Sequence, residues 1–164
     1  MSKLEKRILL IFGMIVLAAA AAVMIRWGGE REIIVNDFVP PAFDSAAVSG
    51  LPVGIDTSTY GTLILADGIA VSLYSAPTVT DGTAQVFFAS HARNTPWVRL
   101  RLLDAQGVLL GETGLLRPGE YVESLILQTM PKSGQVTAKI LTYQPDTYYS
   151  MGSATAQLQL RFAD

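Results

Sequence analysis

Hydrophobic and polar residues alternate with a period of two through several short runs in the second half of the chain. In Trp97–Leu103, Arg99 and Arg101 separate apolar residues, and in Thr155–Phe162 polar residues separate Ala156, Leu158, Leu160 and Phe162. Successive side chains of a β-strand point to opposite faces, so this pattern predicts antiparallel strands with one face on a core. No segment after residue 30 has the longer period of a helix.

Turn signals separate these runs. Asp67-Gly68 lies between the runs Tyr60–Leu65 and Ile69–Tyr74, and Asp-Gly is a strong hairpin signal. Further turns are expected at Asp81-Gly82, Asp104–Gly107, Arg117–Glu120 and Pro131–Gly134. About seven strands, spaced about ten residues apart, are typical of an immunoglobulin-like antiparallel β-sandwich. The chain has no cysteine, which excludes the disulfide of antibody domains.

The N-terminal run Ile8–Ile25 has no charged or polar side chain. At about 1.5 Å per residue it forms a helix of roughly 27 Å, close to the bilayer core of about 30 Å. Basic residues precede it, which places the N-terminus in the cytoplasm and the rest of the chain outside. We therefore predict a single-pass membrane helix over residues 8–27, with Arg7, Arg26 and Trp27 at the membrane interface.

Two fates of this segment stay open. A signal-anchor keeps the helix, whereas a cleavable signal peptide is removed within the alanine tract Ala18–Ala22. The apolar run exceeds the usual length of roughly 7–15 residues in signal peptides, which favours the anchor. The expected organisation is a cytoplasmic stub (1–7), the membrane helix (8–27), a stalk or linker (28–58) and the β-sandwich (59–164).

The stalk is rich in glycine and proline, as linkers are. One stretch within it, Glu32–Val39, is apolar enough to form a strand. Its residues Ile33, Ile34, Val35 and Phe38 either dock on a partner or add a strand to the edge of this protein's own sheet.

Charge is unevenly distributed. Residues 1–27 carry a net charge of +3, and residues 28–164 carry 8 basic and 13 acidic side chains. Nucleic-acid binding needs clustered Lys and Arg, so the acidic main domain argues against a nucleic-acid partner. The partners expected are the lipid bilayer and other envelope proteins or further copies of this chain.

The chain offers little for catalysis. The absence of cysteine and the single histidine, His91, exclude thiolate and multi-histidine metal sites. Ser90 precedes His91, but neighbouring strand residues point to opposite faces and would not meet. No nucleophile elbow, Walker loop or dinucleotide fingerprint occurs. We predict no enzyme activity, no cofactor and no metal site.

The segment between the last two strands is the best candidate for contact with a partner. It holds Tyr143, Tyr148, Tyr149 and Met151, and tyrosine and methionine are enriched at protein interfaces. The alternative is that these tyrosines cap the open end of the core. Trp97, at a strand start, is expected to pack in the core.

The block Asn94–Glu120 resembles a pattern in small, membrane-tethered envelope proteins of Gram-positive bacteria. There a strand ends in Asp-x-x-Gly, and a Gly-Leu-x-x-Pro-Gly turn leads into the next strand. The residues that fit are Asp104, Gly107, Gly114, Leu115, Pro118, Gly119, Leu125, Leu127 and Gly134. The likeness covers roughly residues 84–162. It implies the sandwich fold and membrane tethering, but carries over no catalytic site, because these are turn and core residues.

The sequence therefore predicts a non-enzymatic, membrane-anchored extracytoplasmic module for protein binding or assembly, as a subunit or accessory of an envelope machine or surface structure. The alternative is a secreted or wall-associated module that binds carbohydrate or cell-wall polymer.

Overall fold

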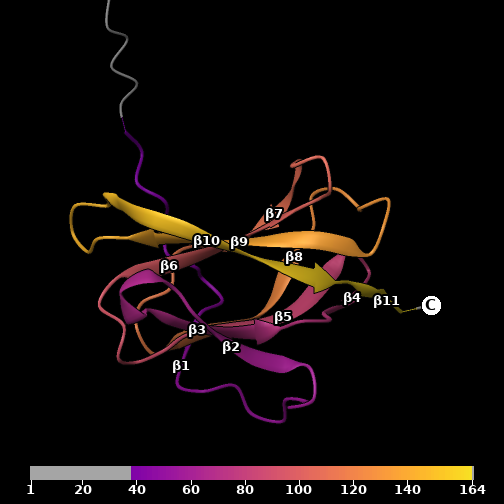
Figure 1. The fold of residues 1–164 in the computed structure, drawn as a ribbon, viewed down its shortest axis with the longest axis horizontal. Helices are drawn as coiled ribbons and strands as arrows, with labels where there is room; N and C mark the ends of the chain where they lie inside the picture. The colour runs from indigo at the N-terminus through magenta and orange to yellow at the C-terminus, as the bar shows by residue number, and fades with distance from the viewer. Residues whose placement is uncertain (1–37, 164) are drawn as a thin grey trace, which may run out of the picture. The chain divides into compact units, whose positions relative to one another are not determined.

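Two β-sheets stacked as layers make up the fold (Figure 1). The structure is a computed structural model and describes residues 38–163. The described chain is all-β apart from a short 3₁₀ turn at Ala66–Gly68. This confirms the expected all-β class and the two antiparallel sheets. The expected helix over residues 8–27 lies outside the described residues, and within residues 38–163 no helix is long and apolar enough to cross a bilayer.

The first sheet has the order β1-β8-β5-β3-β2, with β4 on β5 and β11 on β4. Its strands pair antiparallel except for β11, which runs parallel to β4. Their bounds are β1 Val48–Ser49, β2 Tyr60–Ile64, β3 Ala70–Tyr74, β4 Thr78–Thr80, β5 Thr83–Ser90, β8 Glu120–Ile126 and β11 Arg161–Phe162.

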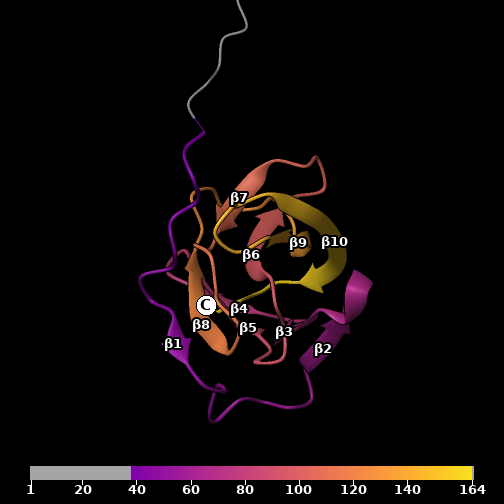
Figure 2. The same ribbon diagram turned by 90° about the vertical axis from the view of Figure 1, so that its left-hand side faces the viewer.

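The second sheet has the order β10-β9-β6-β7 and is antiparallel throughout. Its strands are β6 Trp97–Leu103, β7 Leu109–Glu112, β9 Gln135–Tyr143 and β10 Ser150–Gln159. Figure 2 shows the two layers end-on, with β7 and β10 on opposite flanks of the upper layer and β1 and β2 on opposite flanks of the lower one.

The core lies between the two layers and follows the predicted alternation. Along β6, Val98, Leu100 and Leu102 are fully buried while the residues between them are only half-buried. From the first sheet come Val71, Leu73, Val86, Phe88 and Val122, and from the second also Val136, Ala138, Ile140 and Leu158. The period of two thus places one face of each sheet in a shared apolar layer.

Two Asp-Gly pairs form the turns that the sequence predicted. Asp67 and Gly68 have φ of 60° and 73°, and Asp81 and Gly82 have φ of 49° and 74°. A two-residue hairpin turn whose twist matches the strands needs positive φ at both positions, which Asp and Gly tolerate best. The pairs join β2 to β3 and β4 to β5.

The last strand differs from the single run that the alternation predicted. Leu160 is buried, but Phe162 is 47% exposed instead of facing the core with Leu160. The reason is that the chain leaves the second sheet after Gln159, and β11 pairs with β4 of the first sheet. The C-terminal segment thereby links the two layers.

The compact unit that contains the sandwich begins at Pro40, so it takes in part of the segment expected as a stalk. Leu115 N–H donates to the Ala42 carbonyl at 2.9 Å, and Asp44 N–H donates to the Leu115 carbonyl at 3.0 Å. β1 then pairs with the edge of β8. The chain passes this close because residue 114 is glycine: a Cβ there would lie 2.5 Å from the Asp44 Cα.

We expect Gly114→Ala to lower the free energy of unfolding by about 1–3 kcal/mol, because the new methyl group collides with backbone. Gly61→Ala is the matched control, since a Cβ at Gly61 meets nothing within 4 Å. Denaturant unfolding followed by circular dichroism measures both. Equal stability of the two variants would contradict the close approach.

Candidate functional site

The outer face of the β7-β6-β9-β10 sheet carries the side chains that the core does not use. On β6 these are Trp97, Arg99, Arg101 and Leu103, all half-buried. On β9 the outward positions include Lys139 and Tyr143, in register with β6 as the pairs Arg101–Lys139 and Trp97–Tyr143. One continuous surface therefore runs from aromatic residues at one end to basic residues near its middle.

Three rings form an aromatic cluster, defined here as Phe43, Trp97 and Tyr148. The Trp97 ring centroid lies 4.8 Å from that of Phe43 and 5.0 Å from that of Tyr148, both in edge-to-face geometry. The Arg117 guanidinium stacks over Phe43 at 3.6 Å from the ring centroid, a cation–π contact. Trp97 thus packs on the outer face and not in the core, because it alternates with the buried residues of β6 and so points to the same side as the two arginines of that strand.

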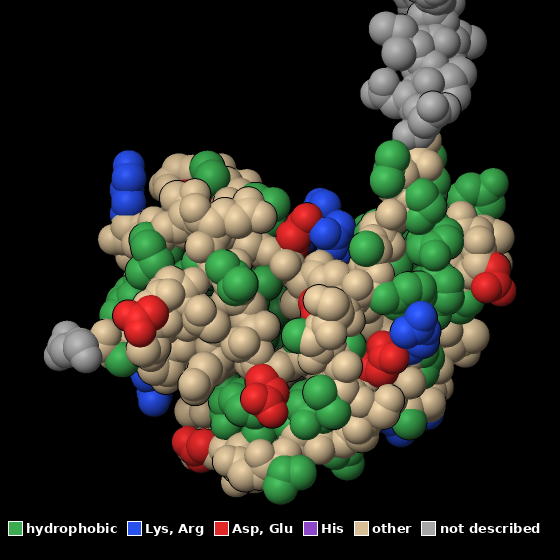
Figure 3. All heavy atoms as spheres, turned by 180° about the vertical axis from the view of Figure 1, so that it is seen from behind, with side chains coloured by type: hydrophobic (Ala, Val, Ile, Leu, Met, Phe, Trp, Pro, Cys, Tyr) green, Lys and Arg blue, Asp and Glu red, His purple; other side chains and the backbone are tan. Residues whose placement is uncertain are grey.

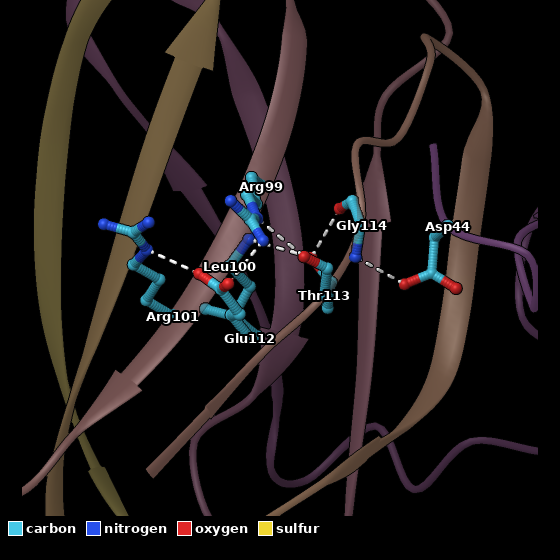
Figure 4. Close-up of polar contacts among 7 residues, drawn as sticks. All are labelled: Asp44, Arg99, Leu100, Arg101, Glu112, Thr113 and Gly114. Carbon is cyan, nitrogen blue, oxygen red and sulfur yellow. Dashed lines mark hydrogen bonds and ion pairs between the residues drawn. The ribbon is translucent and has the colours of Figure 1, made fainter. Parts of the chain in front are cut away.

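Arg99, Glu112 and Arg101 form a bridge of three charges across β6 and β7 (Figure 4). One carboxylate oxygen of Glu112 pairs with a terminal nitrogen of Arg99, and the other accepts from Arg101 Nε at 2.7 Å. Arg99 Nε also donates to the Thr113 carbonyl at 2.7 Å. Such charge-assisted contacts hold both guanidinium groups in fixed positions.

Thr113 and Asp44 extend this polar network toward the N-terminal segment (Figure 4). The buried Thr113 hydroxyl accepts from Leu100 N–H at 3.0 Å and donates to the Gly114 carbonyl at 2.8 Å. Gly114 N–H donates to the Asp44 carboxylate at 2.7 Å. A shallow hollow of about 330 Å³ lies beside these groups and is lined by Asp44, Arg99, Glu112 and Gln128, among others.

The β9–β10 connection closes on itself through backbone hydrogen bonds. Gln144 N–H donates to the Tyr149 carbonyl at 2.8 Å, and Tyr148 N–H donates to the Gln144 carbonyl at 3.0 Å. This turn directs Tyr148 against Trp97 and leaves Tyr149 71% exposed. Of the predicted contact residues, Tyr143 and Tyr148 therefore lie beside Trp97, whereas Tyr149 projects into solvent.

Met151, the fourth predicted contact residue, lies where three connections meet at one end of the sandwich. It is 48% exposed and lines two adjoining hollows of about 110 and 170 Å³. Asp67 and Ile69 of the β2–β3 turn line both hollows, and Asn94 of the β5–β6 connection lines the larger. This end of the molecule thus gathers loop residues from both sheets, as binding ends of sandwiches do.

The outer face of the first sheet holds a second ring group. Tyr74 lies 5.5 Å from Tyr60 and 5.1 Å from Phe87, again edge to face. Phe87 has a φ of 44° at a β-bulge, where the register between β5 and β8 shifts. The interplanar angles, 83° and 71°, give no flat stacking platform among these three rings.

Next to these rings lies a hydrogen-bonded row of polar side chains that the sequence did not reveal. His91 Nε2 lies 2.8 Å from Ser72 Oγ, which lies 2.8 Å from Thr62 Oγ1. Ser90 Oγ instead accepts a hydrogen bond from the buried Asn94 amide, so the side chains of Ser90 and His91 bond to different residues. Ser72 is buried and bonded on both sides, which suits a structural role better than nucleophilic attack.

Two strands at the same flank have an unpaired edge. β10 and β2 are the terminal strands of their sheets, and a groove of about 220 Å³ between them is lined by Leu63, Leu73, Ala156 and Leu158, among others. β10 spans ten residues without a charged residue or a proline. Charges and prolines are the usual protection of an edge against pairing with another chain, so this edge is open to strand addition.

Several predicted site residues lie outside the described part of the chain. These are Arg7, Arg26 and Trp27 of the expected membrane interface and Ile33, Ile34 and Val35 of the expected docking strand. Phe38, from the same docking strand, is described and 65% exposed. Within residues 38–163, no three His, Cys, Asp or Glu side chains gather in a way that could hold a metal ion.

Comparison with protein-family models, curated proteins and solved structures found no match to this chain.

Replacing Glu112 by Gln removes the carboxylate that joins the guanidinium groups of Arg99 and Arg101. We expect Glu112→Gln to lower the free energy of unfolding by about 1–2 kcal/mol, a modest loss because Arg101 is partly exposed. Glu123→Gln is the control, since Glu123 lies exposed on β8. Denaturant unfolding at low and high salt measures both, and a wild-type midpoint for Glu112→Gln would refute the bridge.

Burial raises the pKa of the Tyr60 phenol above its ordinary value of 10.0, although a hydrogen bond with Ser72 opposes the shift. The folded state then holds this proton more tightly than the unfolded state. The stabilising contribution is complete below the unfolded pKa and is lost as the pH rises above it.

We therefore expect Tyr60→Phe to flatten the decline of the melting temperature between about pH 9 and 11. Tyr149→Phe, at an exposed position, should leave the decline as in the wild type. Thermal denaturation across this pH range checks both, and parallel curves for all three proteins would rule out the proposed linkage.

Proposed function

We propose that this chain is a non-enzymatic, membrane-anchored extracytoplasmic module whose β-sandwich binds other proteins or assembles with them. In this proposal it serves as a subunit or accessory of an envelope machine or surface structure of a Gram-positive bacterium. The observation that carries the proposal is the pairing of an apolar, span-length segment with a rigid domain that presents a contact surface.

The apolar run Ile8–Ile25 supports the anchor. Its length suits a bilayer, and the basic residues before it favour a cytoplasmic N-terminus. In this arrangement residues 28–39 connect the membrane to the compact unit that begins at Pro40. An anchored domain meets its partners at high local concentration, which favours assembly through modest contacts.

The order of the strands supports an immunoglobulin-like sandwich. The run β3-β5-β8 corresponds to strands A, B and E of that fold, and β1 takes the place of strand D. The run β10-β9-β6-β7 corresponds to strands G, F, C and C′. Domains of this architecture commonly use the loops at one end for recognition.

Protein contact suits the surface better than carbohydrate binding does. The rings of the aromatic cluster meet at 75° and 64°, so they offer edges and corners instead of a flat surface for stacking sugars. Tyr149 projects from the closed turn next to Tyr148, Met151 is half exposed near the start of β10, and the edge of β10 is open. Anchoring by Tyr and Met together with strand addition is typical of protein interfaces.

The decisive experiment is purification of the full-length tagged chain from its native membranes in mild detergent, with intact-mass measurement of the recovered chain. We expect an intact N-terminus and a reproducible, stoichiometric protein partner. We expect Tyr149→Ser to reduce recovery of that partner at least about fivefold, because exposed tyrosines are frequent binding hot spots.

Ile126→Ser is the matched control, because Ile126 is an equally exposed apolar residue on the other sheet. It should leave recovery of the partner unchanged. A chain that begins near Ala22 or Val23 and is recovered alone from the medium would overturn the proposal and point to the secreted, polymer-binding alternative.

A further inference from the structure

Two basic side chains face each other across β6 and β9. Arg101 and Lys139 are direct cross-strand partners on the outer face of the sheet. The Cβ atoms of such partners lie about 4.5–5.5 Å apart, and like charges placed this way destabilise a sheet. The arrangement costs stability in the absence of an anion between the two groups.

The Glu112 carboxylate, which contacts Arg101, is already paired through both of its oxygens. Glu112 accepts from Arg101 through Nε alone, and its other oxygen pairs with Arg99. In Figure 4 the two terminal nitrogens of Arg101 point away from Glu112. No carboxylate among the described residues pairs with these nitrogens or with Lys139, which leaves several hydrogen-bond donors for an incoming anion.

Charge is also separated over the domain. The strands β6, β7, β9 and β10 carry three basic residues and one acidic residue, all on the outer face, a net charge of +2. Residues 38–163 as a whole carry seven basic and nine acidic residues, a net charge of −2. This sheet face is therefore basic while the rest of the described domain is acidic. On the side of the molecule shown in Figure 3, acidic and basic side chains are scattered and do not gather into one patch.

We propose that the outer face of this sheet binds an acidic segment of a partner protein, with a carboxylate held between Arg101 and Lys139. This inference rests on the proposed binding function and names the chemistry of the partner. Two cationic side chains with hydrogen-bond donors to spare suit one or two carboxylates, whereas phosphate polymers are held by many cations acting together. The half-buried Leu103 and Leu141 beside the pair suit the apolar side chains of a peptide.

The test uses the full-length chain in nanodiscs of zwitterionic lipid. The probe is a short fluorescent peptide rich in glutamate, compared with its glutamine counterpart, and binding is followed by fluorescence anisotropy at about 50 mM salt. We expect the glutamate peptide to bind more tightly. The double variant Arg101→Gln with Lys139→Gln should weaken that binding about tenfold.

Lys132→Gln with Arg161→Gln is the matched control, because it removes the same charge from positions outside this face. It should change the affinity less than about twofold. Equal losses in both double variants would show that only net charge matters and would overturn the inference. Stronger binding of polyphosphate than of the glutamate peptide would overturn it too, because the occupant would then be a phosphate polymer.

The two proposals can fail separately. If the membrane partner is recovered equally with Arg101→Gln/Lys139→Gln and is lost with Tyr149→Ser, the binding function stands and the basic face is excluded. If the peptide result holds but the native chain has no membrane partner, the assembly role fails while the anion site remains. Matching circular dichroism spectra of the variants ensure that each result reflects binding and not folding.

Discussion

The structure depends on the burial of alternate side chains between the two sheets, so that every second residue along a core strand faces the apolar layer. In β6, β9 and β10 the buried side chains all stand at even positions, among them Leu100, Ile140 and Leu158. Because the side-chain period of a strand is two, a slip of one residue would carry Arg101 and Lys139 into the apolar layer. The apolar core therefore fixes which residues form the outer face, and the proposed binding surface follows from the packing.

The strands and turns could be predicted because their signals are local. Alternation within Trp97–Leu103 marked β6, and Asp-Gly marked two turns, since both features depend only on neighbouring residues. The bond from Gly114 N–H to Asp44 could not be predicted, because the two residues are seventy positions apart. The same limit hid the pairing of Ala42–Asp44 with Leu115, which carries part of the expected stalk into the fold.

The candidate site was visible only in part for the same reason. Tyr148 and Met151 stood out by residue type, but their neighbours depend on how distant strands align. The expectation that Trp97 lies in the core rested on its place at a strand start and left out the alternation, which puts Trp97 on the same face as Arg99 and Arg101. At the end of a strand, the odd or even position of a residue predicts which face its side chain points to more reliably than residue type does. A large ring there can pack on the outer face.

On the proposed binding face, stability and recognition are coupled through one side chain. Glu112 neutralises part of the charge on Arg99 and Arg101, which keeps two guanidinium groups side by side on a folded sheet. The same contact uses only the Nε of Arg101 and leaves its two terminal nitrogens pointing away from Glu112. Ordering a long side chain beforehand lowers the entropy lost on binding, so a bridge that stabilises the fold also prepares the surface for an anionic partner. In the proposed membrane-anchored arrangement such modest, pre-ordered contacts would suffice, because tethering itself supplies a high local concentration.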